Sequence, residues 1–468
     1  MENESMDSFI GRTKELQTLQ EAYRSSRSEF IPVYGRRRVG KSELITCFMK
    51  NKPGIYFQAK KNTARLQVKE FLKNAARLLE NPLVEEIQSS DWKFILQNVV
   101  DQWRGDGKLI LAFDEFQWLV QACPELPSVL QELWDRYWKK KRTIFIIICG
   151  SYMGFMEREI LGKKSPLYGR RTFQIFLKPF PYHEAALFHP SWSLENRARI
   201  WFVCGGIPYY LESFDSLMSF ETNIIKNFLG EHGPLFAEPD FLLREELREL
   251  HVYNAILTTL ASGTHTLQNL SLQTGIVEST IGYYLRQLQN LGYIAKKFPL
   301  STIKPGKKDV RYHLDDPLLN FWYRFVYPNM GDISFRGEIN TFKDIIKPQL
   351  KSYFGLCFER LCREALPNIY RKEGVQAPFE IGEYWNPGVQ IDIVGLRKDH
   401  WIDIGECKWG KVTSFEKTVQ KLMQSIGNFP NLKNDTICPR LFIRDFSAGK
   451  RLQKDMKVHT LKELYEFK

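Results

Sequence analysis

The feature that most constrains this chain is the octapeptide GRRRVGKS at residues 35–42. It matches the pattern G-x-x-x-x-G-K-[S/T], and it lies between an apolar segment that predicts a strand, residues 30–34, and a helix-compatible segment, residues 43–50. A loop of this kind wraps phosphates with backbone N–H groups at a helix N-terminus, the lysine adds positive charge, and the hydroxyl ligates Mg²⁺. The residues expected to bind the nucleotide here are Gly35, Arg36, Arg37, Arg38, Val39, Gly40, Lys41, Ser42 and Glu43.

A second apolar segment, residues 109–113, ends in Asp114 and Glu115. A strand placed beside the phosphate-loop strand would aim Asp114 at the magnesium ion. Glu115 would then be positioned to polarise the water that attacks the γ-phosphate, which favours hydrolysis of ATP over its storage. The alternative is a strand end that carries acids only because it is exposed. Lys41 and Glu115 are the expected catalytic pair.

The order of patterns along the chain predicts four domains. At 100–200 residues per domain, 468 residues suggest about two to four. Strand patterns at 30–34, 55–58, 109–113 and 143–149 alternate with helical ones, which is typical of an α/β fold. The expected domains are an ATPase core at 1–176, a helical lid at 177–248, a winged helix at 249–330 and an α/β domain at 331–468.

The first half of the chain resembles the archaeal-type ATPases related to AAA+ and STAND proteins. The resemblance rests on the segment FIGR at residues 9–12, the phosphate loop, Asp114-Glu115 and the segment ICGS at residues 148–151. It implies that Phe9, Gly11 and Arg12 border the adenine. It also implies that Ser151 senses the γ-phosphate, although a serine in an ordinary turn is an equal alternative.

Two further segments match this family. The segment SPLYGRR at residues 165–171 implies that Arg170 or Arg171 acts as an arginine finger, in cis or in trans, because a guanidinium fork stabilises the charge of the transition state. The segment GGIP at residues 205–208 implies that Pro208 of the helical lid touches the base. A solvated basic turn and a simple helix-breaking turn are the respective alternatives.

Residues 266–288 predict two short helices around a turn, and residues 293–313 predict a basic hairpin. This pattern indicates a winged helix, in which the second helix enters the major groove of DNA and the wing contacts phosphates. Winged helices also serve as protein-interaction modules, which is the alternative. The expected DNA-contacting residues are Ser279, Thr280, Tyr283, Tyr284, Arg286, Gln287, Lys296, Lys297, Lys307, Lys308 and Arg311.

The C-terminal region predicts two adjacent strands, residues 388–395 and 401–409. Alternation places Glu406 and Lys408 on one face, and a hairpin would bring Asp392 beside them, giving two carboxylates for a hard cation and a catalytic lysine. This pattern resembles the PD-(D/E)xK nuclease core, with Ile391 where the named pattern has proline. The resemblance implies Glu359 as a further metal ligand, unless it simply pairs with Arg363 at i+4.

The whole order of modules resembles a prokaryotic ATPase family whose C-terminal region is the DUF234 domain of unknown function. The expected fold is therefore α/β: a P-loop AAA+-like core with a helical lid, a winged helix and a C-terminal restriction-endonuclease-like domain. ATP and Mg²⁺ are the expected cofactors, with Mg²⁺ at both sites. The expected activity is an ATPase that controls a metal-dependent nuclease, or alternatively a nucleotide-dependent switch or transcription regulator that does not cleave.

The net charge favours a nucleic-acid partner, and the hydropathy pattern argues against a membrane partner. Lys and Arg exceed Asp and Glu by 12, which favours a nucleic acid, DNA before RNA, as partner. The most apolar segment, residues 144–149, is far shorter than the ~20 residues that span a bilayer, and no signal-peptide pattern is present. A cytoplasmic protein without a membrane partner is expected, with scattered reduced cysteines. A homo-oligomer is left open.

Overall fold

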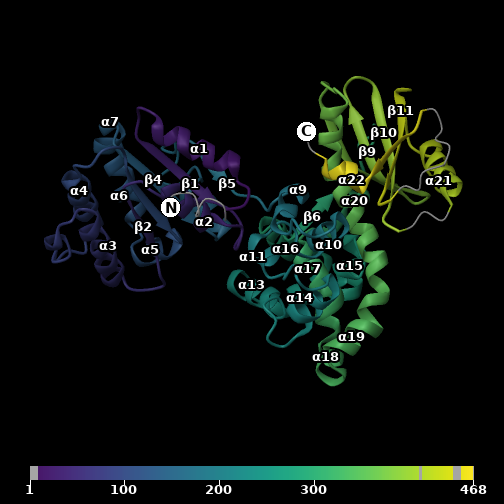
Figure 1. The fold of residues 1–468 in the computed structure, drawn as a ribbon, viewed down its shortest axis with the longest axis horizontal. Coiled ribbons are helices and arrows are strands. Elements are labelled where there is room, and N and C mark those ends of the chain that lie inside the picture. Colours follow the sequence, from purple (N-terminus) through teal and green to yellow (C-terminus); the bar gives the residue numbers. More distant parts are fainter. Residues whose placement is uncertain (1–8, 411–413, 446–454, 467–468) are drawn as a thin grey trace. The chain divides into compact units, whose positions relative to one another are not determined.

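The computed structural model describes residues 9–410, 414–445 and 455–466, and the chain divides into two compact units (Figure 1). The first unit extends to Pro179 and includes Ile207–Tyr209, whereas the second contains Phe180–Gly206 and the chain from Tyr210 onward. The segment predicted as the ATPase core, 1–176, lies within the first unit. The helical segment predicted as its lid belongs to the second unit, apart from those three residues.

The first unit is built on a parallel five-stranded sheet in the order β2-β3-β4-β1-β5. Apolar runs rich in β-branched residues form its central strands, which are buried throughout. The sequence suggested that the strand ending in Asp114 lies directly beside the phosphate-loop strand. In the structure the two strands are separated by β4, which pairs with both. The strands are β1 (Glu29–Tyr34), β2 (Gly54–Gln58), β3 (Leu109–Asp114), β4 (Ile144–Gly150) and β5 (Ile175–Phe176).

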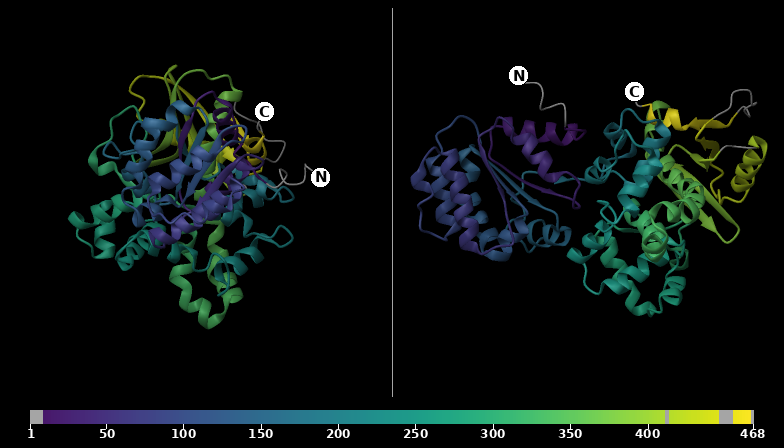
Figure 2. Two further views of the ribbon diagram at one scale, coloured as in Figure 1. Left: turned by 90° about the vertical axis from the view of Figure 1, so that its left-hand side faces the viewer. Right: turned by 60° about the horizontal axis from the view of Figure 1, so that its bottom comes forward.

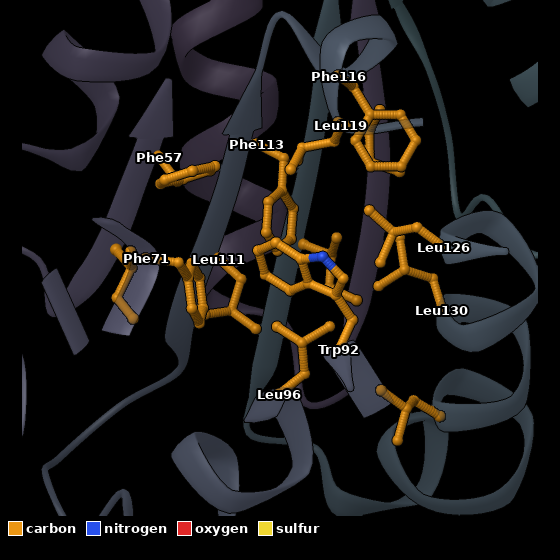
Figure 3. Packing of buried hydrophobic residues seen from close by; sticks show 14 of the residues in the cluster. Phe57, Phe71, Trp92, Leu96, Leu111, Phe113, Phe116, Leu119, Leu126 and Leu130 are labelled. Atoms are coloured by element: carbon orange, nitrogen blue, oxygen red, sulfur yellow. The ribbon is translucent and has the colours of Figure 1, made fainter. Parts of the chain in front are cut away.

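Helices cover both faces of this sheet (Figure 2). On one face, Tyr23 and Phe48 pack against Phe145, with ring centroids 5.8 and 5.2 Å away. On the other, Trp92 lies 5.3 Å from Phe71, which stacks on Phe113 of β3 at 6.0 Å (Figure 3). The helices are α1 (Thr13–Arg24), α2 (Lys41–Met49), α3 (Ala64–Leu78), α4 (Trp92–Gln102), α5 (Phe116–Ala122), α6 (Leu126–Leu133), α7 (Lys139–Lys141) and α8 (Met153–Phe155).

The second unit begins with a helical region. Its central elements are three helices followed by an antiparallel pair of strands, which is the element order expected of a winged helix. The early helices are α9 (Tyr182–Ala185), α10 (Leu194–Cys204), α11 (Pro208–Glu212), α12 (Phe220–Ile224) and α13 (Glu238–Glu246). The elements in the region predicted as a winged helix are α14 (Leu250–Ala261), α15 (Leu267–Thr274), α16 (Glu278–Asn290), β6 (Ile294–Lys297) and β7 (Arg311–Leu314).

A second five-stranded sheet, in the order β12-β11-β10-β9-β8, forms the C-terminal part. Strands β8, β9 and β10 are antiparallel, whereas β11 and β12 continue the sheet in parallel. The long helix α20 is linked to β10 by the hydrogen bond from Tyr370 to Asp403, and α21 packs its apolar residues on Ile402 and Ile404. The elements are α17 (Pro317–Phe321), α18 (Met330–Arg336), α19 (Glu338–Thr341), α20 (Lys347–Lys372), β8 (Phe379–Asn386), β9 (Val389–Arg397), β10 (Trp401–Lys408), α21 (Phe415–Gly427), β11 (Thr436–Ile443), β12 (Lys457–Thr460) and α22 (Leu461–Tyr465).

A helix that crosses a membrane must be both long and apolar. Within the part of the chain that the structure describes, no helix combines the length and the apolar character needed to cross a bilayer.

Substitution of Trp92 tests how much the buried aromatic cluster stabilises the first unit. Replacing Trp92 with alanine should lower the free energy of unfolding of this unit by about 3–5 kcal/mol, because a large buried side chain leaves a cavity. Chemical denaturation followed by circular dichroism measures the loss. Phe94→Ala is the matched control, since Phe94 lies on the same helix but is 49% exposed. Equal losses in the two variants would contradict this account of the core.

Candidate functional site

The phosphate loop joins β1 to α2 and has a geometry that only small residues permit at two positions. A Cβ atom on Gly35 would lie 2.3 Å from the carbonyl oxygen of Leu177, and Gly40 adopts a φ of 89° just before the helix begins. Lys41 is buried, and its Nζ donates to the carbonyl oxygens of Gly35 at 3.0 Å and Arg36 at 2.8 Å. Its ammonium group therefore holds the loop in a curved conformation.

Burial lowers the pKa of Lys41, and the negative charges of Glu115 and Asp114 oppose this effect. Three positively charged residues, 36–38, occupy the variable positions of the loop. Arg36 and Arg37 are half-buried, whereas Arg38 is exposed and its guanidinium lies 3.8 Å from the ring centroid of Tyr209. Glu43, also expected at the nucleotide, is exposed on the first turn of α2.

Asp114 occupies the end of β3 and is 1% exposed. Its Oδ2 accepts hydrogen bonds from the hydroxyl of Ser42 at 2.6 Å and from that of Tyr56 at 2.5 Å. Burial, followed by the hydrogen bond to Asp114, raises the pKa of Tyr56, so this hydroxyl remains a donor. The structure thus brings Ser42 and Asp114 together as predicted, as a pair of hard oxygen donors that suits Mg²⁺.

Glu115 has a φ of 51°, an uncommon conformation for a non-glycine residue. Its carboxylate accepts a hydrogen bond from the hydroxyl of Ser151 at 2.9 Å and another from the amide of Gln117. Ser151 directly follows β4, the strand between β1 and β3, which explains why it reaches a residue that ends β3. Glu115 and Ser151, two residues predicted independently, therefore lie in contact.

Arg12 fastens the first helix to the phosphate loop. Its guanidinium donates to the carbonyl oxygen of Val39 at 3.1 Å and to that of Lys178 at 2.7 Å. Phe9 and Gly11, which precede it, are half-buried. On the other side of the loop, Pro208 lies in the first unit, with its Cγ 3.6 Å from the position of a Cβ on Gly40. The structure therefore brings Arg12 and Pro208 to the loop.

The two candidate arginine fingers differ in their surroundings. Arg170 forms a two-pronged ion pair with Asp135 and also donates to the carbonyl oxygens of Pro166 and Tyr168. Its side chain is thereby held on its own loop. Arg171 is half-buried. Burial raises the pKa of the Tyr34 hydroxyl, and the positive charge of Arg171 partly opposes this rise.

The C-terminal carboxylates meet where β9 and β10 lie side by side. Gly405 pairs with Ile393, so the next residues along the two strands are Glu406 and Asp392, as the sequence predicted. Both are buried, and Oδ2 of Asp392 accepts a hydrogen bond from the backbone N–H of Cys407 at 2.9 Å. Burial, followed by the negative charge of Glu406, raises the pKa of Asp392.

Two lysines neutralise Glu406. Lys408, predicted from the strand pattern, and Lys421 on α21 both lie 2.6 Å from its Oε1. Glu406 itself is 1% exposed, and a carboxylate buried this deeply requires such compensation. The lysines are much more exposed than the carboxylate they serve.

Glu359 of α20 forms the ion pair that was the alternative to its role as a metal ligand. Its Oε2 lies 4.0 Å from Nη1 of Arg363, the i+4 partner, and the same Nη1 donates to the carbonyl oxygen of Asp392 at 2.6 Å. Burial, followed by the charge of Asp392, raises the pKa of Glu359. Among the described residues, no group of three or more Asp, Glu, His or Cys side chains forms a metal-binding cluster.

Helix α16 is the second of the two helices that were predicted around a turn at residues 266–288. It exposes most of the predicted DNA-contacting residues of this segment. Ser279, Thr280, Tyr283 and Arg286 are exposed, and Gln287 is half-buried. Tyr284 is a correction: it is only 8% exposed. Its hydroxyl donates to Glu249 at 3.0 Å and its ring packs on Tyr253 at 5.2 Å, so it belongs to the core of this region.

The wing contacts the C-terminal sheet, which is a second correction to the predicted DNA surface. Nζ of Lys297 lies 2.8 Å from Oε1 of Glu383 on β8, and the guanidinium of Arg311 lies 4.6 Å above the ring of Trp385. Both cations are therefore engaged inside the second unit, because Glu383 is buried and needs a counter-charge. Lys296 and Lys308 are exposed. The side chain of Lys307 lies outside the described part of the chain.

Several residues at these sites were missed by sequence reasoning. They are Tyr56, Gln117, Glu383, Trp385 and Lys421. Lys421 lies on a strongly amphipathic segment, but only the packing of α21 shows which carboxylate it meets. Tyr56 could be found only by knowing that β2 pairs with β3.

Glu383 provides a test of the contact between the wing and the sheet. Burial opposes its ionisation, but the positive charges of Arg363 and Lys297 outweigh burial and hold its pKa at about 2. Because this value is below that of an unfolded chain, the contact stabilises the fold above about pH 4.5 and the stabilisation is lost as the pH falls toward 2.

Glu383→Gln should therefore lower the free energy of unfolding by roughly 2–3 kcal/mol at pH 7. The difference from the wild type should shrink as the pH falls below about 4.5. Denaturation curves between pH 3 and 7 measure it. Glu380→Gln, an exposed residue of the same strand, is the control. A difference that does not depend on pH would contradict the assigned charge pairing.

Comparisons with known proteins match both parts of the chain. Residues 9–214 match the family described as an ATPase domain predominantly from Archaea. Residues 322–429 match DUF234, described as archaeal and bacterial proteins of unknown function. The two matches correspond to the phosphate-loop region and to the region around Glu359 and Asp392.

Individual proteins agree with these matches. A protein of Methanocaldococcus jannaschii is 30% identical over 420 residues, which is 89% of this chain and 91% of the relative. An ATP-binding protein of the same organism is 43% identical over 44 residues, 9% of this chain and 75% of its own. The structure of a Walker-type ATPase of Pyrococcus abyssi is 20% identical, has a TM-score of 0.52, and covers 68% of this chain and 97% of that one. The chain therefore belongs to the archaeal-type P-loop ATPase family in which this ATPase domain is joined to a C-terminal DUF234 domain.

Proposed function

We propose that this ATPase binds DNA through its second unit and that its nucleotide state controls a metal-dependent nuclease-like site around Asp392 and Glu406. The observation that carries the proposal is the meeting of these two buried carboxylates with Lys408 and Lys421 where β9 and β10 pair. Such a group is costly to bury without a function that uses it.

The ATP site performs its chemistry with the residues already described. Ser42 and Asp114 would hold Mg²⁺, which supplies positive charge to the phosphates when bound. Lys41 begins the helix that follows the phosphate loop, and its ammonium group would add positive charge where negative charge develops on the phosphates. Glu115 orients and polarises the attacking water, while the Ser151 hydroxyl holds its carboxylate in position.

The C-terminal site has the donor set for phosphodiester hydrolysis. Asp392 and Glu406 offer carboxylate oxygens to a hard cation, and Glu359 lies close enough for its charge to act on them. Lys408 and Lys421 place ammonium groups at the same carboxylate, where they can stabilise a phosphate oxygen. DNA would reach this unit through the exposed residues of α16, together with Lys296 and Lys308.

A specific observation favours a second candidate, a nucleotide-dependent switch that grips nucleic acid without cutting it. Both lysines already neutralise Glu406, and Arg363 and Lys297 compensate the nearby acids Glu359 and Glu383. A site that is internally neutralised in this way can bind a phosphate backbone with its lysines alone. In that case metal ions would not alter its action.

Glu115 provides the test of the ATPase chemistry. Glu115→Gln should reduce ATP turnover by about 100-fold or more while leaving ATP binding nearly unchanged, since the amide cannot accept a proton from water. Phosphate release and calorimetric binding measure the two effects. The control is Glu125→Gln, an exposed residue just before α6. Turnover that survives in Glu115→Gln would remove this residue from the mechanism.

Cleavage assays separate the two candidate functions. Supercoiled, linear and single-stranded DNA are incubated with Mg²⁺ or Mn²⁺, with and without ATP. Cleavage should disappear in Glu406→Gln and fall in Lys421→Ala, whereas Lys417→Ala, exposed on the same helix, should cut normally. All variants should still hydrolyse ATP. If the wild type binds DNA and hydrolyses ATP but cuts none of these substrates, the switch is the correct function.

A further inference from the structure

A cavity of about 590 Å³ lies within the second unit, beside the C-terminal carboxylate site. Its walls come from α10, α14, the wing strands β6 and β7, α20 and β8. The volume falls in the range of small-molecule binding sites. Glu359 and Arg363 line it, but Asp392, Glu406 and Lys408 do not, so the cavity adjoins the carboxylate site without being part of it.

The cavity has an excess of positive charge. Its lining includes the cations Lys297, Arg311, Arg324, Arg360 and Arg363 but only the acids Asp315, Glu359 and Glu383. These acids pair with three of the cations, namely Arg360, Arg363 and Lys297. Among the described residues, no carboxylate lies within ion-pair distance of Arg311 or Arg324. Arg311 stacks on Trp385 and feels the charge of Glu383, so in the described part of the chain Arg324 is the cavity arginine with no carboxylate beside it.

Two buried nitrogen atoms at the cavity also lack partners. Arg324 donates from Nη1 to the carbonyl oxygen of Ala261 at 3.0 Å, but its buried Nε has no acceptor among the described residues. Nε2 of His313 is likewise buried without a partner, while the ring stacks on His265 at 4.2 Å. A buried polar atom left unpaired costs about 1–3 kcal/mol, so the wall of the cavity is polar and under-satisfied at these two residues.

We propose that this cavity binds a nucleoside 5′-phosphate, either as a free nucleotide or as the terminal nucleotide of a nucleic-acid strand. Arginine forks match phosphate oxygens in geometry and charge, which assigns the phosphate to the side of Arg324, with Arg360, whose partner Asp315 lies 3.7 Å away, beside it. The apolar part of the lining, which includes Leu260, Leu314 and Leu356, accommodates the flat base. The proposal does not depend on cleavage at Asp392 and Glu406.

The first experiment uses the full chain with its ATP site saturated by ADP and Mg²⁺. Each of the four ribonucleoside 5′-monophosphates, and each parent nucleoside, is titrated calorimetrically. At least one monophosphate should bind, and its nucleoside should bind at least about tenfold more weakly because it lacks the charged group. Arg324→Gln and Arg360→Gln should each weaken the monophosphate about tenfold or more, whereas Arg286→Gln, exposed on α16, should not.

A second experiment distinguishes the two sources of the ligand. Single-stranded oligonucleotides that carry a 5′-phosphate or a 5′-hydroxyl are compared by fluorescence anisotropy in the presence of a metal chelator. A preference for the phosphorylated strand that is lost in Arg324→Gln assigns the cavity to strand ends. Binding of the free monophosphate without this preference assigns it to a small nucleotide.

The variants themselves require one check. Arg324 donates a hydrogen bond to the carbonyl oxygen of Ala261 at the end of α14, so its replacement could unfold the protein. Thermal melting establishes whether Arg324→Gln folds. If it does not fold, the proposal is tested with Arg360→Gln, because Arg360 is more exposed. The proposal is overturned if no monophosphate and no phosphorylated strand binds better than its unphosphorylated counterpart. It is also overturned if a folded variant of either arginine binds as the wild type does.

Discussion

The second unit depends on the burial of one carboxylate, Glu383 on β8. A buried charge of this kind is tolerated only when cations surround it, and here Lys297 arrives from the wing while Arg363 acts on it from α20. Backbone contacts reinforce the same junction, because the N–H of Leu300 donates to the carbonyl oxygen of Glu383 at 2.8 Å. The wing, the long helix and the C-terminal sheet are therefore joined by electrostatics as well as by apolar packing. The walls of the adjoining cavity are a product of that junction.

Asp114 and Glu406 are both buried carboxylates, and each is compensated by a different kind of partner. Asp114 is buried among hydroxyl groups, which donate hydrogen bonds but leave its negative charge intact for a cation. Glu406 is buried among ammonium groups, which cancel its charge. A divalent ion at the first site would meet, among the described residues, no cation that is hydrogen-bonded to the carboxylate, whereas at the second it would compete with two lysines.

Local signals in the sequence were sufficient for the phosphate loop, for the strand that ends in Asp114 and for the pairing of Asp392 with Glu406, because each depends on residues close together in the chain. Contacts between distant segments were not accessible in this way. The sheet order that separates β1 from β3 is set by long-range pairing, and without it neither Tyr56 nor the reach of Ser151 to Glu115 could be foreseen. Tyr284 and Lys297 were misjudged for the same reason, since only tertiary packing decides which polar side chains of a surface pattern become buried.

The chain leaves the first unit through the immediate surroundings of the phosphate loop. The N–H of Leu177 donates to the carbonyl oxygen of Tyr34, just before the loop, and Arg12 grips the carbonyl groups of both Val39 and Lys178. The segment that precedes the first crossing into the second unit and the phosphate loop are therefore joined by hydrogen bonds. Residues 177 and 178, which precede the first crossing into the second unit, are thus held by the same contacts that shape the phosphate loop.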